Sequence, residues 1–98
     1  MGWEKTKCYL CDKPAEEWYI QGNLRIRCFN CNSFYSLSSH IQQFRLDENK
    51  NLITKDKNIL SSKQKKNLLH YVQSNKDPEG KVPVMIKLEK YDDLLRRE

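Results

Sequence analysis

The sequence has no long apolar run, which argues against a segment that exports the protein or anchors it. The first residues, MGWEKTKCYLC, lack the hydrophobic stretch of a signal peptide, and no later stretch is long enough to cross a membrane. We therefore expect a cytoplasmic protein with no membrane partner. In that reducing compartment, cysteine thiols bind metal or carry out redox chemistry and rarely form disulfides.

The chain also lacks the length for a large core. Its 98 residues, of which 38% are hydrophobic, predict one domain. A domain of this size buries a modest core and often needs a covalent or metal staple. The four cysteines are the residues that can supply one.

Recognisable catalytic constellations are missing as well. Neither His40 nor His70 has a Ser or Cys nucleophile at a familiar spacing. We expect His40 to be half-exposed at the edge of the buried face of the first helix, and His70 to face solvent. Adjacent acidic residues point to different sides of a strand or helix and make poor acid/base dyads. The two such pairs are Glu16 with Glu17 and Asp92 with Asp93. We therefore expect that the protein is not an enzyme.

The formal net charge of +5 is by itself a weak argument for nucleic acid. Four zinc-bound thiolates and their ion would lower it to about +3. The distribution is more informative, because six lysines between residues 50 and 66 stand against the single Asp56. This segment is a candidate for phosphate contacts, and the alternative is an ordinary solvated linker and helix start.

The strongest chemical signal is a pair of Cys-x2-Cys motifs separated by sixteen residues, Cys8 with Cys11 and Cys28 with Cys31. This is a zinc-site spacing, in which two tight turns present four thiolates to a tetrahedral ion. Four cysteines close the coordination shell, so the site should be structural. Two disulfides or an iron site of the rubredoxin kind are the alternatives, and a redox-active motif is a weaker one.

The residue after each second cysteine favours the metal interpretation. Turns of this kind usually need a left-handed backbone there, commonly supplied by glycine. Asp12 and Asn32 are the non-glycine types that tolerate this conformation best.

The segment between the motifs, EEWYIQGNLRIR, predicts a β-hairpin that bends about Gly22. We expect Trp18 to pair with Ile26 on a buried face and Tyr19 with Arg25 on a polar face. The same register pairs Ile20 with Leu24 and Glu17 with Arg27.

The rest of the chain predicts a third strand at 34–37, helices at 39–48, 62–75 and 89–98, a polar mobile connector at 49–58 and a strand at 82–88. Ser38 or Ser39 should cap the first helix, and Ser61 or Ser62 the second. The residues expected to face inward are Leu37, Ile41, Phe44, Ile59, Leu60, Leu68, Leu69, Tyr71 and Val72. Pro83 favours an edge position for the last strand.

These elements predict a small α+β fold. A four-cysteine zinc ribbon, made of a β-hairpin and a third strand, should be followed by two or three short helices and a short edge strand. The ribbon is expected at residues 1–37 and the helical extension at residues 38–98, packed together as one cooperative unit.

The stretch CYLCDKPAEEW…LRIRCFNCNSFYSLS resembles the amino-terminal zinc-ribbon modules of certain bacterial multidomain proteins, and the likeness continues loosely in LSSKQKKNLLHYVQSN and VPVMI. Its specific positions are the four cysteines, Tyr35 and Ser38. Where those modules have proline and glycine in the knuckles, this chain has Tyr9, Phe29, Asp12 and Asn32. Modules of that group usually precede a larger effector or sensor domain, some in apparent antiviral-defence operons. The resemblance implies a recognition or accessory role.

The first functional hypothesis is a non-catalytic zinc-binding module that binds DNA or RNA through a basic surface, mainly by phosphate contacts. Its candidate contacts are Tyr19, Arg25, Arg27, Lys55, Lys57, Lys63, Lys65 and Lys66. Tyr19 and Arg25 together are candidates for stacking on a base, with a plain hairpin face as the alternative.

The second hypothesis is a protein-interaction module, either an adaptor or accessory domain of a bacterial defence system or a phage-type inhibitor. It would dock through Leu94 and Leu95, or through exposed aromatic residues at Trp3, Tyr9 and Phe29.

Overall fold

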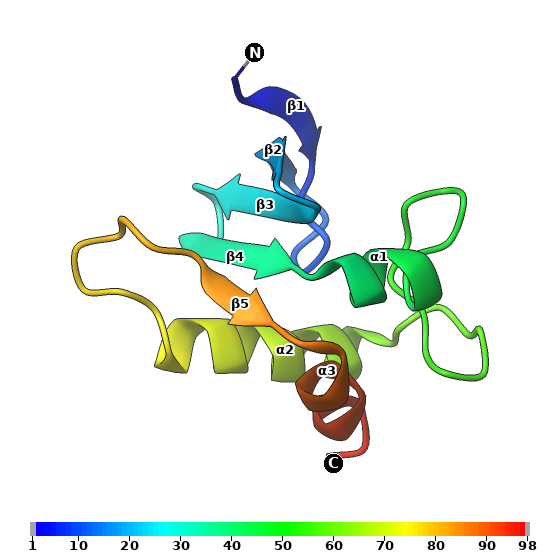
Figure 1. Ribbon diagram of the computed structural model, residues 1–98. Helices are drawn as coiled ribbons and strands as arrows, with labels where there is room; N and C mark the ends of the chain where they lie inside the picture. The colour runs from blue at the N-terminus through cyan, green and yellow to red at the C-terminus, as the bar shows by residue number, and fades with distance from the viewer. Residues whose placement is uncertain (1, 98) are drawn as a thin grey trace.

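The computed structural model describes residues 2–97, which form a five-stranded sheet and three helices (Figure 1). The strands lie in chain order across the sheet. The first four are antiparallel, and the fifth is an edge strand parallel to the fourth. The elements are β1 (Glu4–Lys7), β2 (Pro14–Ile20), β3 (Asn23–Cys28), β4 (Ser33–Leu37), α1 (Ser39–Phe44), α2 (Ser62–Ser74), β5 (Val84–Ile86) and α3 (Leu88–Leu95). The predicted α+β class and short edge strand are confirmed.

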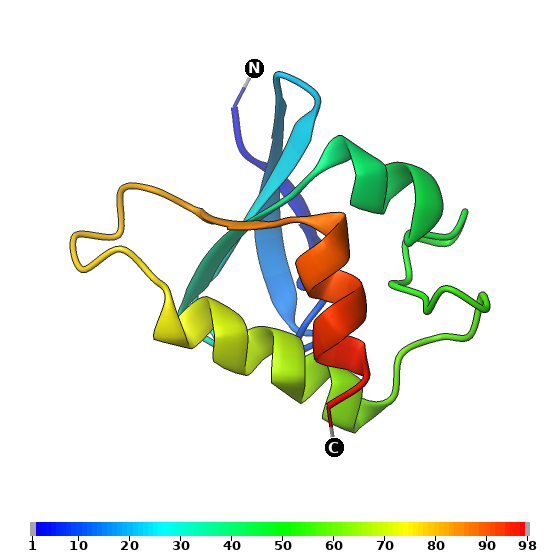
Figure 2. The same ribbon diagram turned by 60° about the horizontal axis from the view of Figure 1, so that its bottom comes forward.

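Alternation along the strands gives the sheet two unlike faces. In β3, Leu24, Ile26 and Cys28 are buried, whereas Arg25 and Arg27 point to the other side and are partly exposed. We call these the covered face and the open face. The covered face packs with the helices around a core whose fully buried members include Tyr35, Ile41, Leu68, Ile86 and Tyr91. Figure 2 shows α1 and α3 side by side on one side of the sheet.

Residues paired across neighbouring strands place their side chains on the same face, so the register identifies the open face. Trp3 joins this face through its contact with Trp18. Its strand residues are Lys5, Lys7, Pro14, Glu16, Trp18, Ile20, Asn23, Arg25, Arg27, Phe34, Ser36 and Met85.

The helix starts follow the predicted caps. The Ser38 hydroxyl accepts a hydrogen bond from the Ile41 N–H, and the Ser61 hydroxyl accepts one from the Gln64 N–H. The Gln64 side chain accepts in turn from the Ser61 N–H, which completes a capping box. On α2 the predicted inward face is correct. Leu68 and Val72 are fully buried, and Leu69 and Tyr71 are partly buried.

The predicted register of the β2–β3 hairpin is wrong by one residue. Ile20 pairs with Asn23, so the turn contains two residues, Gln21 and Gly22, with φ angles of 52° and 79°. A two-residue turn with both φ values positive matches the twist of the flanking strands, whereas the predicted bend had three residues.

The shift changes which side chains share a face. Trp18 pairs with Arg25 on the open face, and Tyr19 pairs with Leu24, although Tyr19 remains 61% exposed near the hairpin end. The predicted Trp18–Ile26 and Tyr19–Arg25 pairs are therefore wrong. Arg27 pairs with Glu16 instead of Glu17, with its Nε 2.8 Å from the Glu16 Oε1.

Two segments are more ordered than the sequence suggests. β1 was missed because its residues, EKTK, have no apolar alternation, yet they pair along β2. The segment 49–58, predicted as a mobile connector, is folded into two tight turns closed by the bridges Leu46–Leu52 and Ile53–Ile59. The turns are held because Leu52 is buried in the core and the Tyr91 hydroxyl donates to the Ile53 carbonyl.

The first helix ends earlier than predicted, at Phe44. Phe44 is 51% exposed, and Arg45 is buried in its place, with both ends of its guanidinium 2.8 Å from the Asp92 carboxylate. Ile59, also predicted to face inward, is exposed, whereas Leu60 is buried. The Arg45–Asp92 pair thus ties α1 to α3 where an aromatic contact was expected.

We expect Asp92→Asn to lower the free energy of unfolding by about 1.5–3 kcal/mol, because it leaves the buried Arg45 guanidinium without its charged partner. The matched control is Asp93→Asn on the same helix, whose ion pair with Arg97 is exposed. That change should cost less than about 0.5 kcal/mol. Urea denaturation followed by far-ultraviolet circular dichroism measures both, and equal effects would contradict the assigned role of the pair.

Candidate metal centre

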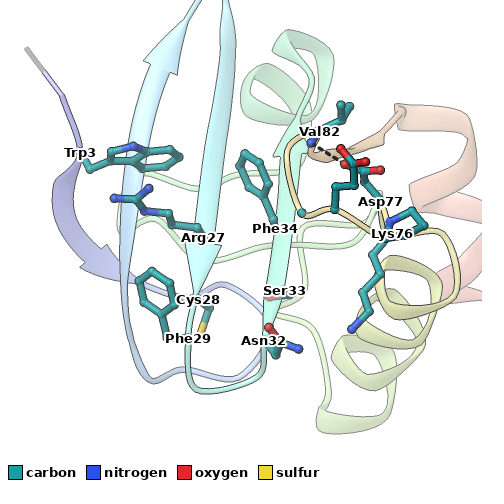
Figure 3. A pocket seen from close by; sticks show the side chains of 13 residues that line it. Trp3, Arg27, Cys28, Phe29, Asn32, Ser33, Phe34, Lys76, Asp77 and Val82 are labelled. Carbon is teal, nitrogen blue, oxygen red and sulfur yellow. Dashed lines mark hydrogen bonds between the residues drawn. The ribbon is translucent and has the colours of Figure 1, made fainter.

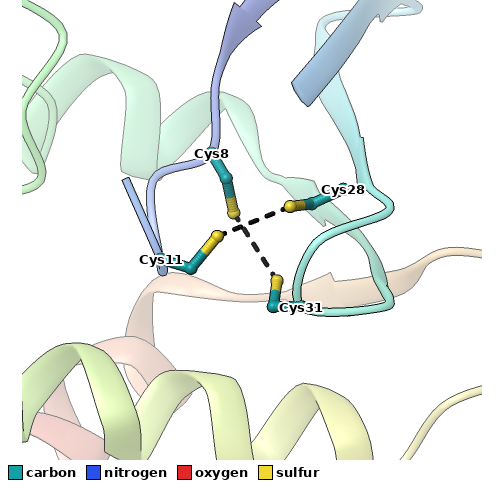
Figure 4. A group of neighbouring side chains, drawn as sticks. All are labelled: Cys8, Cys11, Cys28 and Cys31. Carbon is teal, nitrogen blue, oxygen red and sulfur yellow. Dashed lines mark hydrogen bonds between the residues drawn. The ribbon is translucent and has the colours of Figure 1, made fainter. Parts of the chain in front are cut away.

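The four cysteines converge from two turns at one end of the sheet. Cys8 and Cys11 lie in the turn between β1 and β2, Cys28 ends β3, and Cys31 lies in the turn before β4. All four sulfur atoms lie within 4.8 Å of one another and point toward a common centre (Figure 4). The Sγ–Sγ distance is 3.9 Å between Cys8 and Cys31, and 3.5 Å between Cys11 and Cys28.

Both turns have the backbone that the sequence predicts. Asp12 has a φ of 63° and Asn32 a φ of 53°, so each adopts the left-handed conformation that folds its knuckle back. The first knuckle is closed by hydrogen bonds from the Cys8 N–H to the Lys13 carbonyl and from the Asp12 N–H to the Cys8 carbonyl.

The sulfur arrangement fits a tetrahedral metal ion. With metal–sulfur bonds of about 2.3 Å, the edges of a regular tetrahedron are about 3.8 Å, close to the two sulfur–sulfur distances above. The same distances are far longer than the roughly 2.05 Å of a disulfide bond, and all four cysteines are free. These residues can therefore hold a metal ion with a closed four-sulfur shell.

Polar groups surround the sulfurs as donors. The Leu10 N–H lies 3.4 Å from Cys8 Sγ, and the Ser33 hydroxyl lies 2.9 Å from Cys31 Sγ. The buried Tyr35 hydroxyl accepts from the Tyr9 N–H at 3.0 Å and lies 3.3 Å from Cys8 Sγ, so it donates to this sulfur when Cys8 is a thiolate. Tyr35, a position of the sequence resemblance, thus orients a cysteine of the cluster.

Burial raises the pKa of the Cys8 and Cys31 thiols, against the opposing hydrogen bonds from Tyr35 and Ser33. The pKa of Cys11 lies below its ordinary value. Burial raises the pKa of this thiol, but hydrogen bonds to its sulfur lower it by more, and the largest of these comes from the Lys13 backbone. A cation at the centre is what favours four thiolates in such a site, and its binding releases protons.

Helix α2 holds both knuckles, which the sequence did not predict. Lys65 Nζ lies 3.1 and 3.0 Å from the two carboxylate oxygens of Asp12, and these bonds keep the pKa of Asp12 below its usual range against the effect of burial. The Gln73 side chain donates to the carbonyls of Cys31 and Asn32, at 2.6 and 3.1 Å. Lys65 is therefore part of the support of the metal site, although it was predicted to be a free phosphate contact.

The predicted nucleic-acid contacts do not form one surface. Tyr19 and Arg25 lie on opposite faces of the hairpin, so they do not stack on one base as a pair. The remaining lysines are exposed on the turns of segment 49–58 and the start of α2: Lys55, Lys57, Lys63 and Lys66. Arg27 lies elsewhere, on the open face, against the ring of Trp3.

The residues named for a protein partner are also divided. Leu94 is 3% exposed and belongs to the core, and Leu95 is only partly exposed. Tyr9 is buried, whereas Phe29, between the two cysteines of the second knuckle, is 77% exposed.

No family model, curated protein or solved structure matches the chain. The resemblance to bacterial zinc-ribbon modules therefore stays a prediction. Among residues 2–97, no helix has the length and apolar character needed to span a bilayer.

Tyr35→Phe should weaken the binding of a divalent metal by about 10- to 100-fold, because it removes the hydroxyl between the Tyr9 N–H and Cys8 Sγ. The control is Tyr71→Phe, which alters a partly exposed ring on α2 that lies against Lys90 of α3. Competition for Zn²⁺ against a chromogenic chelator gives both affinities. Unchanged affinity in Tyr35→Phe would show that this hydroxyl does not support the site.

Proposed function

We propose that this protein is a non-catalytic recognition module, stabilised by zinc, that binds nucleic acid. The observation that carries the proposal is the closed set of four sulfurs at one end of a sheet. The open face of this sheet bears basic and aromatic side chains. A shell of four cysteines leaves no position for a substrate, which is typical of structural zinc and not of catalytic zinc.

Zinc is the metal we assign, because a tetrahedral four-thiolate shell suits zinc or iron–sulfur chemistry and two linked knuckles are the usual frame of a structural zinc ion. The support around the sulfurs favours a stabilising role. Lys65 and Gln73 attach α2 to both knuckles, so the ion would hold the sheet and this helix in place together.

Nucleic acid is the ligand class that the exposed charges favour. The sequence has 18 basic and 13 acidic residues, and several acidic side chains are already paired within the fold. Asp12 and Asp92 are bound by Lys65 and Arg45, for example. Each of these pairs uses one basic and one acidic side chain, so the excess of five basic residues is unchanged by them. With four zinc-bound thiolates the net charge is about +3. This positive charge favours a ligand that carries phosphates.

A protein partner is the second candidate, favoured by one specific observation. Phe29 and Val82, which line a common cavity, are large apolar side chains with exposures of 77% and 63%. Exposed aromatic anchors beside a cavity are also a feature of protein interfaces. Leu94 cannot serve as the anchor, because it is buried.

Zinc should be required for folding. We expect one Zn²⁺ per chain in native mass spectrometry, and loss of the folded state with chelator or in Cys28→Ser, because a structural zinc site supplies on the order of 10 kcal/mol. Phe29→Ala, which changes the neighbouring residue without removing a ligand, is the control and should keep both zinc and fold. Finding no zinc, with a fold that resists chelator, would refute this part of the proposal.

Nucleic-acid binding should depend steeply on salt. A titration followed by fluorescence anisotropy, with labelled single-stranded and duplex oligonucleotides, should give a log–log slope of about −0.7 per phosphate on single strands and −0.9 on duplex. Three or four contacts then give a slope of roughly −3. Binding weaker than about 100 μM at low salt would contradict the nucleic-acid assignment, since non-specific binders usually exceed that affinity.

A further inference from the structure

The open face of the sheet carries a cluster of aromatic rings around one arginine. The Arg27 guanidinium lies 4.0 Å from the centre of the Trp3 ring and 5.8 Å from that of Phe29. Trp3 also contacts Trp18 and Phe34 edge-on, with ring centres 5.6 and 6.1 Å away. The cluster is held in place, because the Arg27 Nε donates to Glu16 at 2.8 Å.

A cavity of about 380 Å³ lies beside this cluster. Trp3, Arg27 and Phe29 line one side of it, and the loop that follows α2, with Asp77 and Val82, lies across from them (Figure 3). The loop is braced internally. The Asp77 carboxylate accepts hydrogen bonds from the Lys81 and Val82 N–H groups at 2.8 and 3.3 Å. The wall opposite the rings is therefore a structured one.

The charges of the open face favour an anionic ligand. Its strand residues include four basic side chains, Lys5, Lys7, Arg25 and Arg27, and one acidic side chain, Glu16. Glu16 is bound to Arg27, and on the cavity wall Glu79 is paired with Lys81. Lys7 is likewise paired with Asp12, and the cavity wall itself has two basic and two acidic side chains. The excess of positive charge on the open face therefore comes from Lys5 and Arg25.

The aromatic rings and the basic side chains of the open face together narrow the class of ligand. A cationic ligand of the kind that aromatic cages bind is disfavoured, because Arg27 already lies against the Trp3 ring. A duplex hides its base faces within the helix, so it gives exposed rings nothing to stack on. Single strands present both a charged backbone and free base faces, and aromatic rings beside cations on a sheet bind both.

We propose that the open face binds single-stranded nucleic acid, with a base stacked on Phe29 at the cavity and phosphates bound by Arg25, Arg27 and Lys5. This inference rests on the proposed nucleic-acid function and assigns its site. It places binding away from the exposed lysines of segment 49–58, whose turns lie at the opposite end of the molecule from the loop after α2 (Figure 1 and Figure 2).

The chain carries its own reporter for this site, since both of its tryptophans, Trp3 and Trp18, lie on the open face. Titration of the zinc-loaded protein with oligothymidylate or oligouridylate of about fifteen nucleotides should change their intrinsic fluorescence at saturation. Binding of either strand supports the proposal, and their relative affinities show which sugar is preferred. A hairpin duplex of equal charge should bind more weakly and leave the fluorescence nearly unchanged.

Substitutions then locate the site. Phe29→Ala should weaken single-strand binding by about 5- to 150-fold, the range for loss of one stacked base. Phe29→Trp should restore it. The matched control is Phe44→Ala, which removes another exposed aromatic residue, on α1, and should bind like the original protein. Lys55→Glu with Lys57→Glu should reduce affinity by less than Phe29→Ala does.

The outcomes separate the site from the function. Unchanged binding in Phe29→Ala, or loss of binding only in the Lys55 and Lys57 variant, would overturn the open-face site while nucleic-acid binding stands. An acidic peptide that changes the tryptophan fluorescence as strongly as oligothymidylate would also overturn it. If the original protein binds no oligonucleotide at low salt, the proposed function itself fails.

Discussion

The convergence of four sulfur atoms is the constraint on which the rest of the structure depends. Two of them come from the turn after β1, one from the last residue of β3 and one from the turn that follows it, so their meeting fixes how these two turns face each other. Helix α2 follows from the same constraint, because Lys65 bonds one knuckle and Gln73 the other. A small chain thereby orders its sheet and its longest helix around one point, where apolar burial alone would be marginal.

The two faces of the sheet are chemically different. The covered face holds the aliphatic residues of β3 and β4 against the helices, and the open face holds arginines and aromatic rings at the alternate positions. Alternate residues of the same strands therefore supply the core and the exposed surface. A substitution at the buried Ile26 would lower the stability of the fold, whereas a substitution at the partly exposed Arg25 would alter the charge of the open face. The shared backbone keeps the surface groups in a fixed spacing.

Local features of the fold could be predicted from the sequence, and features set by distant contacts could not. The cysteine spacing, the left-handed positions Asp12 and Asn32, and the caps Ser38 and Ser61 each depend on a few neighbouring residues. The hairpin register was missed because a two-residue turn and a three-residue turn both fit this sequence and differ only in backbone twist.

The β1 strand, the Arg45–Asp92 pair and the bond from Lys65 to Asp12 depend on residues far apart in sequence. No local pattern encodes those contacts. The exposed Phe29 was named as an aromatic contact, but Trp3, which lies against Arg27 in the same cluster, precedes β1 and is far from Arg27 in sequence.

The parallel pairing of β5 with β4 bears on how the chain leaves the ribosome. β4 is complete at Leu37, but the strand that covers its free edge lies at residues 84–86, after all of α2. During synthesis the growing chain therefore presents an unpaired strand edge beside a finished antiparallel sheet. Such edges are templates for pairing with other chains. Until Val84 to Ile86 emerge and pair with β4, the nascent protein can associate with other chains through this edge.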